Sequence, residues 1–442
     1  MPKTFPEGQK LHSRFFRTAQ IPPLRLIFGF RLNIARISDC MKPLAQRTDS
    51  IRQSDIRSIT TMVNAVNGIN LGQGICDLPA PDPVKQGAIN AITFNQNTYT
   101  SYAGIPELRC AIAEKARRFN KIPVQGDEDV VVSIGSTGAF VSTMFTLFEP
   151  GDEAILFEPY YGYHRNLLRL PGAITRTITT RGLNWDVDFD EVRAAINPKT
   201  KAMVINTPSN PCGKVWTRDE LTQVVALAEA HDLYLITDEI YEYMTYDGRE
   251  HVSLASLPGA YERTVTLSGF SKTYNMTGWR LGYALGPAKL MEKIGLLNDL
   301  FYICAPAPLQ HGLAEAFMMP DDYFVDMMAD YTRKRQLMGE TLEAIGFNVP
   351  WPQGAYYILG DFSPLAGRDG FSNDQEASET LIREAKIAAV PGNSFFQHPE
   401  DGRYFLRFCL PKNGRCYKKP AIRCFVLLDP PKSIPYPKRL RA

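Results

Sequence analysis

The sequence predicts an α/β fold: one large, mostly parallel β-sheet with helices on both faces, followed by a smaller C-terminal α/β domain. From about residue 127, short apolar runs alternate with helical stretches, a pattern typical of such a sheet. The runs are apolar throughout, as strands covered on both faces usually are. The composition, 44% hydrophobic and 22% charged over 442 residues, is that of an ordinary globular protein.

The predicted elements follow in chain order. The first strand covers 129–134, and a helix opens directly after it on the small residues 135–138. A second helix begins at Thr217, because Glu220 three residues later completes a capping box. Long amphipathic stretches then run from Pro287 to Gly346. The other predicted strands cover 153–158, 201–206, 233–238, 264–268 and 404–408.

The predicted domain organisation has five segments: a disordered basic extension at 1–40, an N-terminal arm at 41–80 that contributes to the small domain, a large domain at 81–330, a small domain at 331–411, and an atypical basic, proline-rich tail at 412–442. The extension is rich in arginine and poor in acids, which fits a transit-type targeting segment. The alternative, which we favour, is a non-native extension upstream of an ordinary start at Met41.

Charge and cysteine usage exclude several classes of protein. Residues 1–40 carry seven Lys and Arg against two acids, and residues 408–442 carry nine against one, so residues 41–407 hold 33 basic and 44 acidic side chains. Such an acidic body argues against nucleic-acid binding. Eight scattered cysteines without a CxxC pair favour a reducing cytoplasm, with no disulfide framework and no metal site. No apolar run approaches the ~18 residues of a membrane span.

Several predicted strands end in residues that can do chemistry. Ligands of such sheets gather at the carboxyl ends of the strands. The stretch 135–138, Gly-Ser-Thr-Gly, reads either as a tight turn or as a phosphate site at a helix start. Asp238 fits a helix cap or a partner for a pyridinium nitrogen. Lys272, among apolar neighbours, fits a desolvated amine nucleophile better than a surface lysine, and Arg280 fits a phosphate ligand.

Five separated motifs, in order, carry a family resemblance. The stretches "GINLGQGICDLPAP", "YTSYAGIPELR", "NTPSNPCGK", "TDEIY" and "SGFSKTYNMTGWRLG" are similar to motifs of the class I/II aminotransferases, which are pyridoxal 5′-phosphate (PLP) enzymes of fold type I. The resemblance extends from about Arg47 to Pro411 and is strongest to the subgroup of aspartate, aromatic and kynurenine–glutamine transaminases. It implies transfer of an amino group from an L-amino acid to a 2-oxo acid.

The resemblance implies a role for each matching residue. Lys272 would hold PLP as a Schiff base and shuttle protons, and Asp238 would pair with the pyridine nitrogen. Tyr241 and Asn210 would bind the phenolic oxygen of the ring, and Tyr161, rather than Tyr160, would stack on the ring. The phosphate would be held by Ser136, Thr137, Gly138, Ser268, Ser271, Arg280 and, from the partner subunit of a homodimer, Tyr99. The substrate α-carboxylate would be held by Arg407, Gly74 and Asn210.

The sequence departs from the family pattern at three places. Cys212 stands where threonine is common, and Gly269 stands where some subgroups have serine, which leaves Ser268 and Ser271 to share its role. After Arg407 the expected long closing helix is replaced by a segment with six prolines.

Two further interpretations stay open at this point, and a third is argued against. One is a PLP-dependent β-lyase acting on cysteine conjugates, and another is an inactive product with a disrupted C-terminus. A PLP-fold regulator would need an N-terminal DNA-binding domain, for which forty residues are too few.

Overall fold

The computed structural model describes residues 42, 44–48, 55–74, 78–317 and 319–410. The chain forms two units, Met1–Ser50 and Ile51–Ala442, and the described residues of the first are 42 and 44–48, which include the 3-10 turn Gln46–Thr48. The expected extension at 1–40 and tail at 412–442 lie outside them. No helix in the described ranges has the length and apolar character needed to cross a membrane.

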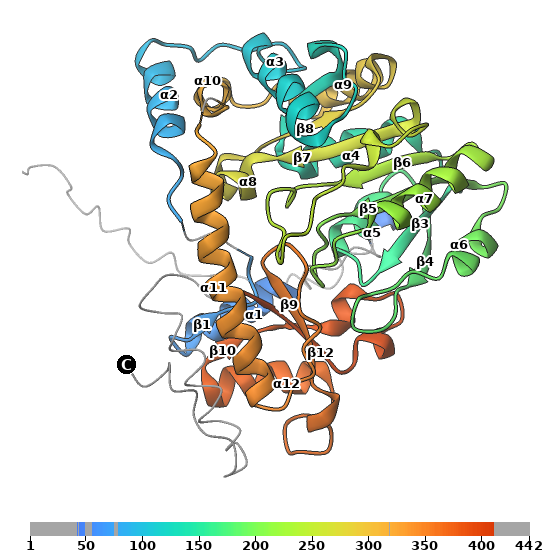
Figure 1. Cartoon of the computed structure of the whole chain (residues 1–442), viewed down its shortest axis with the longest axis vertical. Helices are drawn as coiled ribbons and strands as arrows, with labels where there is room; N and C mark the ends of the chain where they lie inside the picture. The colour runs from blue at the N-terminus through green and yellow to red at the C-terminus, as the bar shows by residue number, and fades with distance from the viewer. Residues whose placement is uncertain (1–41, 43, 49–54, 75–77, 318, 411–442) are drawn as a thin grey trace, which may run out of the picture. The chain divides into compact units, whose positions relative to one another are not determined.

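The second unit is organised around a seven-stranded sheet (Figure 1). Its strand order is β2-β8-β7-β6-β5-β3-β4, and β8 alone runs antiparallel to its neighbours β2 and β7. The remaining pairings are parallel. The strands are β2 (Val130–Ile134), β3 (Glu153–Glu158), β4 (Ile174–Thr179), β5 (Thr200–Asn206), β6 (Tyr234–Asp238), β7 (Thr264–Gly269) and β8 (Leu281–Leu285).

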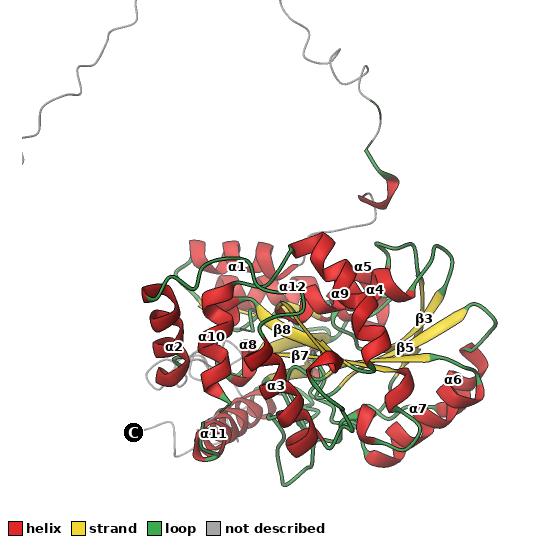
Figure 2. Cartoon of the chain, turned by 90° about the horizontal axis from the view of Figure 1, so that it is seen from above, coloured by secondary structure: helices red, strands yellow, loops and turns green. Residues whose placement is uncertain are grey.

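Helices cover both faces of this sheet (Figure 2). Because side chains of a strand alternate between faces, Ala202 and Val204 of β5 pack into the cluster formed with α4 and α9, whereas Met203 and Ile205 pack against α7. The helices are α1 (Asp55–Ala65), α2 (Asp82–Thr93), α3 (Pro106–Lys115), α4 (Gly135–Leu147), α5 (Gly162–Leu168), α6 (Phe189–Ala195), α7 (Arg218–Ala230), α8 (Phe270–Thr273), α9 (Ala288–Tyr302), α10 (Ala307–Ala316), α11 (Asp322–Ala344) and α12 (Asp374–Thr380).

A second core lies around two smaller sheets. One has the order β11-β12-β9, all antiparallel, and the other is the parallel pair β1-β10. The 23-residue helix α11 packs its buried side chains into this core. The amide of Cys409 on β12 donates to the carbonyl of Leu71, so the early part of the chain is joined to its last described strand. These strands are β1 (Ile69–Asn70), β9 (Tyr357–Asp361), β10 (Ile387–Ala388), β11 (Val390–Pro391) and β12 (Phe405–Cys409).

The structure confirms the predicted α/β class and the mostly parallel sheet. Five predicted strands of the large sheet and the strand near 404–408 are present within one or two residues of their expected bounds. In the large sheet, the sequence analysis missed β4, an edge strand with half-exposed polar side chains, and β8, which directly follows Arg280.

The predicted capping box at the start of α7 is also confirmed. The Thr217 hydroxyl accepts from the amide of Glu220 at 3.2 Å, and the Glu220 carboxylate accepts from the amide of Thr217 at 2.8 Å. These bonds satisfy two amides that the helix itself leaves without a partner.

We predict that Thr217→Ala lowers the free energy of unfolding by about 1 kcal/mol, because one of these amides loses its acceptor. The measurement is the midpoint of urea unfolding. Thr217→Ser retains the hydroxyl and is the matched control, expected to stay near the parent value. Equal destabilisation by the two variants would contradict the capping role.

Candidate active site

The candidate site lies where the carboxyl ends of β5, β6 and β7 meet the small sheets. Asn206 and Asp238 end β5 and β6, and Lys272 lies on α8, directly after β7. Arg407 comes from β12, and Gly74 follows β1. The site therefore draws on segments from both ends of the described chain.

Lys272 is half-buried on the short helix α8. Its Nζ donates to the carbonyl oxygen of Gly74 at 3.2 Å and makes a short contact with the hydroxyl of Tyr356. The amine lies 5.1 Å from the centre of the Tyr356 ring and 5.9 Å from that of Tyr241. No carboxylate of the described residues forms an ion pair with it, so the amine is surrounded by neutral acceptors and aromatic rings.

Asp238 is held by a histidine. Its Oδ2 lies 2.9 Å from Nε2 of His164, and its Oδ1 accepts from the amide of Ile240 at 3.2 Å. The His164 ring is buried, stacked on Phe140 at 4.9 Å, and meets the Tyr161 ring edge-on at 5.4 Å. The carboxylate is thus fixed at the end of β6.

Tyr161 lies beside this pair. Burial, with a smaller effect from the Tyr357 phenol, raises the pKa of Tyr161 above its ordinary value, so its hydroxyl stays protonated. Tyr160, the alternative for the stacking role, instead accepts from Arg165 at 3.1 Å. Tyr161 thus contacts the histidine that holds Asp238, whereas the Tyr160 hydroxyl is engaged by Arg165.

A second pair of tyrosines closes the other side. The Tyr241 hydroxyl donates to that of Tyr357 at 3.1 Å, and burial, followed by the nearby Tyr357, raises the pKa of Tyr241 well above its ordinary value. A side chain at Gly74 would overlap the Tyr357 hydroxyl. The close approach of the chain at Gly74 therefore requires glycine.

Arg407 is a buried cation whose described partners are all neutral. It is 1% exposed, Nη1 donates to Oδ1 of Asn210 at 2.9 Å, and Nη2 donates to the carbonyl of Gly72. Its guanidinium stacks on Tyr357 at 4.6 Å and Phe395 at 5.2 Å. Nε has no acceptor among the described residues, and no carboxylate pairs with the group there. A buried charge of this kind is suited to binding a carboxylate.

A cradle for an anion lies at the start of α4. The first four amides of a helix have no partner within it, and no side chain of the described residues caps this helix. The Arg280 guanidinium lies so close to Gly135 that a Cβ there would collide with it. Gly282 lets β8 approach the amide of Ser136 in the same way. Two positive features are thus held together, and among the described residues no carboxylate pairs with Arg280.

The residues predicted around the phosphate fall into two groups. Ser136, Thr137 and Gly138 lie in the first turn of α4, and Ser271 lies in α8 beside Lys272. Ser268 is a correction: its hydroxyl is buried and donates to Oε1 of Glu242 at 3.1 Å, so it is committed behind the sheet. Gly269 pairs closely with β8, where a Cβ would lie 2.9 Å from the Cα of Gly282.

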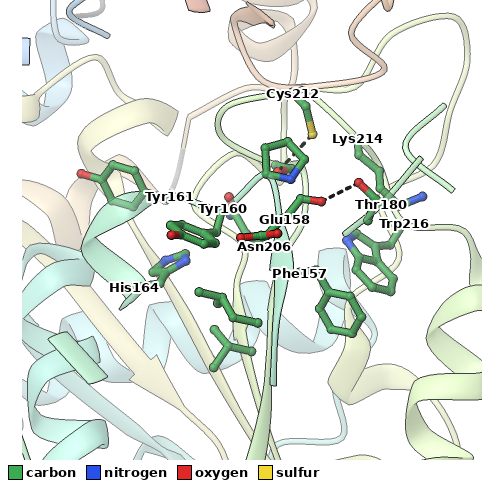
Figure 3. Close-up of a pocket in the computed structure, with 14 residues that line it drawn as sticks. Phe157, Glu158, Tyr160, Tyr161, His164, Thr180, Asn206, Cys212, Lys214 and Trp216 are labelled. Carbon is green, nitrogen blue, oxygen red and sulfur yellow. Dashed lines mark hydrogen bonds between the residues drawn. The ribbon is translucent and has the colours of Figure 1, made fainter. Parts of the chain in front are cut away.

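A pocket lies between β3, β5 and the loop after β5 (Figure 3). Tyr161, His164, Asn206 and Cys212 are among the side chains that line it. Burial raises the pKa of the Cys212 thiol, whose sulfur lies 3.5 Å from the Ser209 hydroxyl. Cys212 therefore acts as a small neutral side chain in this loop.

The contacts join the predicted residues into one site. They run from Lys272 through Gly74 and Tyr357 to Arg407 and Asn210, and Asn206 links the Asn210 amide to the backbone of Asp238. Tyr99 lies apart, with 81% of its surface exposed. The sequence analysis missed His164, Tyr356 and Tyr357. Only the position of His164 on α5, three residues after the N-cap Tyr161, offered a local signal.

The α/β fold and the cationic side chains at the carboxyl edge of its sheet are suited to binding small anionic ligands. Comparison with known proteins then identifies the family. The model of the family described as aminotransferase class I and II matches residues 66–413, so the chain belongs to this family and is an aminotransferase. The predicted resemblance, fold type and enzyme class are confirmed.

Similar proteins cover most of the chain. Kynurenine–oxoglutarate transaminase 3 of Mus musculus is 32% identical over 394 residues, which span 83% of this chain and 86% of that protein. The aspartate/prephenate aminotransferase of Thermus thermophilus is 35% identical over 368 residues, which span 82% and 91%. The structure of aspartate aminotransferase from Thermus thermophilus with maleate matches with a TM-score of 0.81 at 32% identity, over 88% of this chain and 100% of that chain.

We predict that Arg407→Lys lowers kcat/KM for the amino acid roughly ten- to a hundredfold, because lysine keeps the charge but loses the paired N–H donors; a hydrogen bond to a charged group contributes about 1.5–3 kcal/mol. Steady-state transamination measures the effect. Arg403→Lys, at an exposed arginine of the same domain, is the matched control and should be neutral. Identical behaviour of the two variants would remove Arg407 from the substrate site.

Proposed function

We propose that this aminotransferase binds PLP on Lys272 and holds the α-carboxylate of an L-amino acid or 2-oxo acid on Arg407. The observation that carries the proposal is that one continuous site contains both a lysine amine and a buried arginine. Neither has an acidic partner among the described residues. A substrate with one amino group and one carboxylate complements both.

The residues present fit the cofactor. The cradle formed by the start of α4 and Arg280 would take the phosphate, because backbone amides and a guanidinium both bind that group. Asp238, fixed by His164, would lie at the ring nitrogen, and Tyr161 would lie against the ring face. Tyr241 and Asn210 would bind the phenolic oxygen. When bound, PLP supplies a carbonyl carbon for the amino group and a ring that withdraws electrons from the substrate Cα.

The chain's own groups divide the remaining work. The Lys272 amine, close to neutral acceptors only, attaches the cofactor and then moves the proton at the substrate Cα. Arg407 fixes the carboxylate, so the Cα–H bond is presented in one orientation. Gly72 and Gly74 bring the backbone close enough for their carbonyls to reach Arg407 and Lys272.

The donor amino acid is proposed from the relatives. Among them are a kynurenine–oxoglutarate transaminase, an aromatic-amino-acid aminotransferase and an aspartate aminotransferase. We propose a donor among these classes and a 2-oxo acid as acceptor. A half-reaction screen, in which each amino acid is added separately to the PLP form, identifies the donor from the loss of the absorbance of the bound cofactor.

We also propose a homodimer in which Tyr99 reaches the cofactor phosphate of the partner subunit. Exposed apolar side chains gather on α2, on the segment after it and at the end of α9: Ile89, Ile92, Phe94, Tyr99, Leu300 and Ile303. The side-chain amide of Asn298 on α9 donates to the backbone carbonyl of Tyr102, which joins this helix to the segment carrying Tyr99. Such exposure is typical of a surface that a second copy covers.

We further propose a cytoplasmic location. Cys110, Cys212 and Cys304 are free thiols in the structure, which fits a reducing compartment.

We predict that borohydride reduction of the PLP form, followed by peptide mapping, labels Lys272. Lys272→Ala should abolish this attachment and transamination while PLP still binds noncovalently through the cradle. Lys289→Ala, at an exposed lysine on α9, should change neither. A label on another lysine would overturn the assignment.

We predict that Leu300→Asp weakens the dimer and that the affinity for PLP falls with it, because the phosphate site loses Tyr99 of the second copy. Sedimentation and PLP titration measure the two effects. Val325→Asp places the same charge at another exposed apolar position, on α11, and should be neutral. A monomeric wild-type protein with tight PLP binding would contradict the proposal.

A further inference from the structure

The Tyr356 hydroxyl, the Lys272 amine and the Gly74 carbonyl lie within hydrogen-bonding distance of one another. Its hydroxyl donates to the carbonyl of Gly74 at 3.1 Å and contacts Lys272 Nζ, which itself lies 3.2 Å from the same carbonyl. Sequence reasoning gave Tyr356 no role, and the proposed function uses Lys272 and Gly74 without it. The three groups come from three distant parts of the chain.

The Tyr356 ring is fixed by its neighbours. It is 2% exposed and lies directly before β9, where its carbonyl accepts from the amide of Leu410 at 2.8 Å. Tyr331 stacks on it at 5.8 Å, and Tyr241 and Tyr357 meet it at 5.4 Å and 4.6 Å. A ring packed on several sides holds its hydroxyl in one place, so the contact with Lys272 is a property of the fold.

The donor and acceptor of each of these hydrogen bonds follow from the hydrogens that each group has. A carbonyl oxygen only accepts, so the single hydrogen of the Tyr356 hydroxyl goes to Gly74 and its oxygen accepts from Lys272. A neutral amine has two N–H groups and one lone pair. The two oxygens, of Tyr356 and Gly74, accept both hydrogens and leave the lone pair uncommitted. A nucleophile or a base needs that lone pair.

We propose that Tyr356 is a positioning residue that, with the Gly74 carbonyl, holds the amine of Lys272 whenever this amine is not bonded to the cofactor. The inference rests on the proposed attachment of PLP to Lys272. When the substrate amine forms its bond to the cofactor carbon and the bond from Lys272 breaks, the two hydrogens of the incoming neutral amine end on Lys272 Nζ. These are the two hydrogens that the oxygens of Tyr356 and Gly74 accept.

The adjacent tyrosine serves the opposite end of the site. The Arg407 guanidinium lies over the Tyr357 ring, and the Tyr357 hydroxyl accepts a hydrogen bond from the Tyr241 hydroxyl. Two consecutive residues thus position the two groups that handle the substrate, the amine through Tyr356 and the carboxylate-binding arginine through Tyr357.

The test uses Tyr356→Phe, which keeps the ring and removes the acceptor. Added to the cofactor-free enzyme, PLP should be captured covalently about tenfold more slowly than by the wild type, as followed by absorbance and borohydride trapping, since one hydrogen bond to the amine is lost. In the amino-acid half-reaction, the rate constant should fall by a similar factor while the half-saturating concentration stays constant. A 3-fluorotyrosine at position 356, which weakens the oxygen as an acceptor without changing the packing, should give an intermediate rate.

Two controls separate positioning from structure. Tyr246→Phe removes a buried hydroxyl that donates to the carbonyl of Ala355, the residue before Tyr356, and should leave the capture rate unchanged. In a Lys272→Ala background, Tyr356→Phe should not alter the Kd for PLP, because the tyrosine acts through the lysine. Equal slowing by Tyr246→Phe, or a changed Kd in the lysine-free background, would overturn the inference.

The outcome for the proposed function is distinguishable. If wild-type borohydride labelling misses Lys272, the proposed attachment itself fails. If Lys272 is labelled but both Tyr356→Phe and the fluorotyrosine variant capture PLP at the wild-type rate, only the role of Tyr356 is wrong.

Discussion

The burial of Arg407 without an acidic partner in the described chain is the constraint on which the rest of the site depends. A guanidinium removed from water is strongly unfavourable unless its donors are satisfied. The acceptors are Asn210, in the loop after β5, and the carbonyl of Gly72, shortly after β1. The ring faces belong to Tyr357 of β9 and to Phe395. Holding this one cation therefore brings the parts of the enzyme together, and leaves its charge available to a carboxylate.

The motif "TDEIYE" shows how one short segment serves two surfaces. Asp238 and Tyr241 face the site, whereas Glu239 and Glu242 are buried behind the sheet. Burial alone would raise the pKa of Glu242, but Lys115, 2.5 Å away, together with His251 and Asn120 outweighs this effect and lowers the pKa. Glu239 accepts from Ser253 and lies 3.0 Å from His251. The backbone that carries Asp238 and Tyr241 is thus held by a layer of buried polar side chains.

The fold and much of the site could be predicted because their signals are local. Parallel strands buried on both faces are continuous apolar runs, and Lys272, Asp238 and Arg280 lie in short motifs. The edge strand β4 could not be found this way, because three threonines and an arginine interrupt its two isoleucines and leave no continuous apolar run. The partners of Tyr356 lie 84 and 282 residues away along the chain, so no local pattern reports them. Ser268 was misplaced for a related reason: its strand position was known, but the face its hydroxyl occupies depends on Glu242.

The order of the strands along the chain has a consequence for synthesis. The seven-stranded sheet is complete at Leu285, whereas Arg407 lies on β12, between β11 and β9. Domains generally fold as units as the chain leaves the ribosome. Under the proposed assignment, a nascent chain therefore completes the strands that carry Asp238 and Lys272 before the strand that carries Arg407. A polypeptide truncated between these points would keep the proposed cofactor residues and lack the arginine proposed to hold the substrate carboxylate.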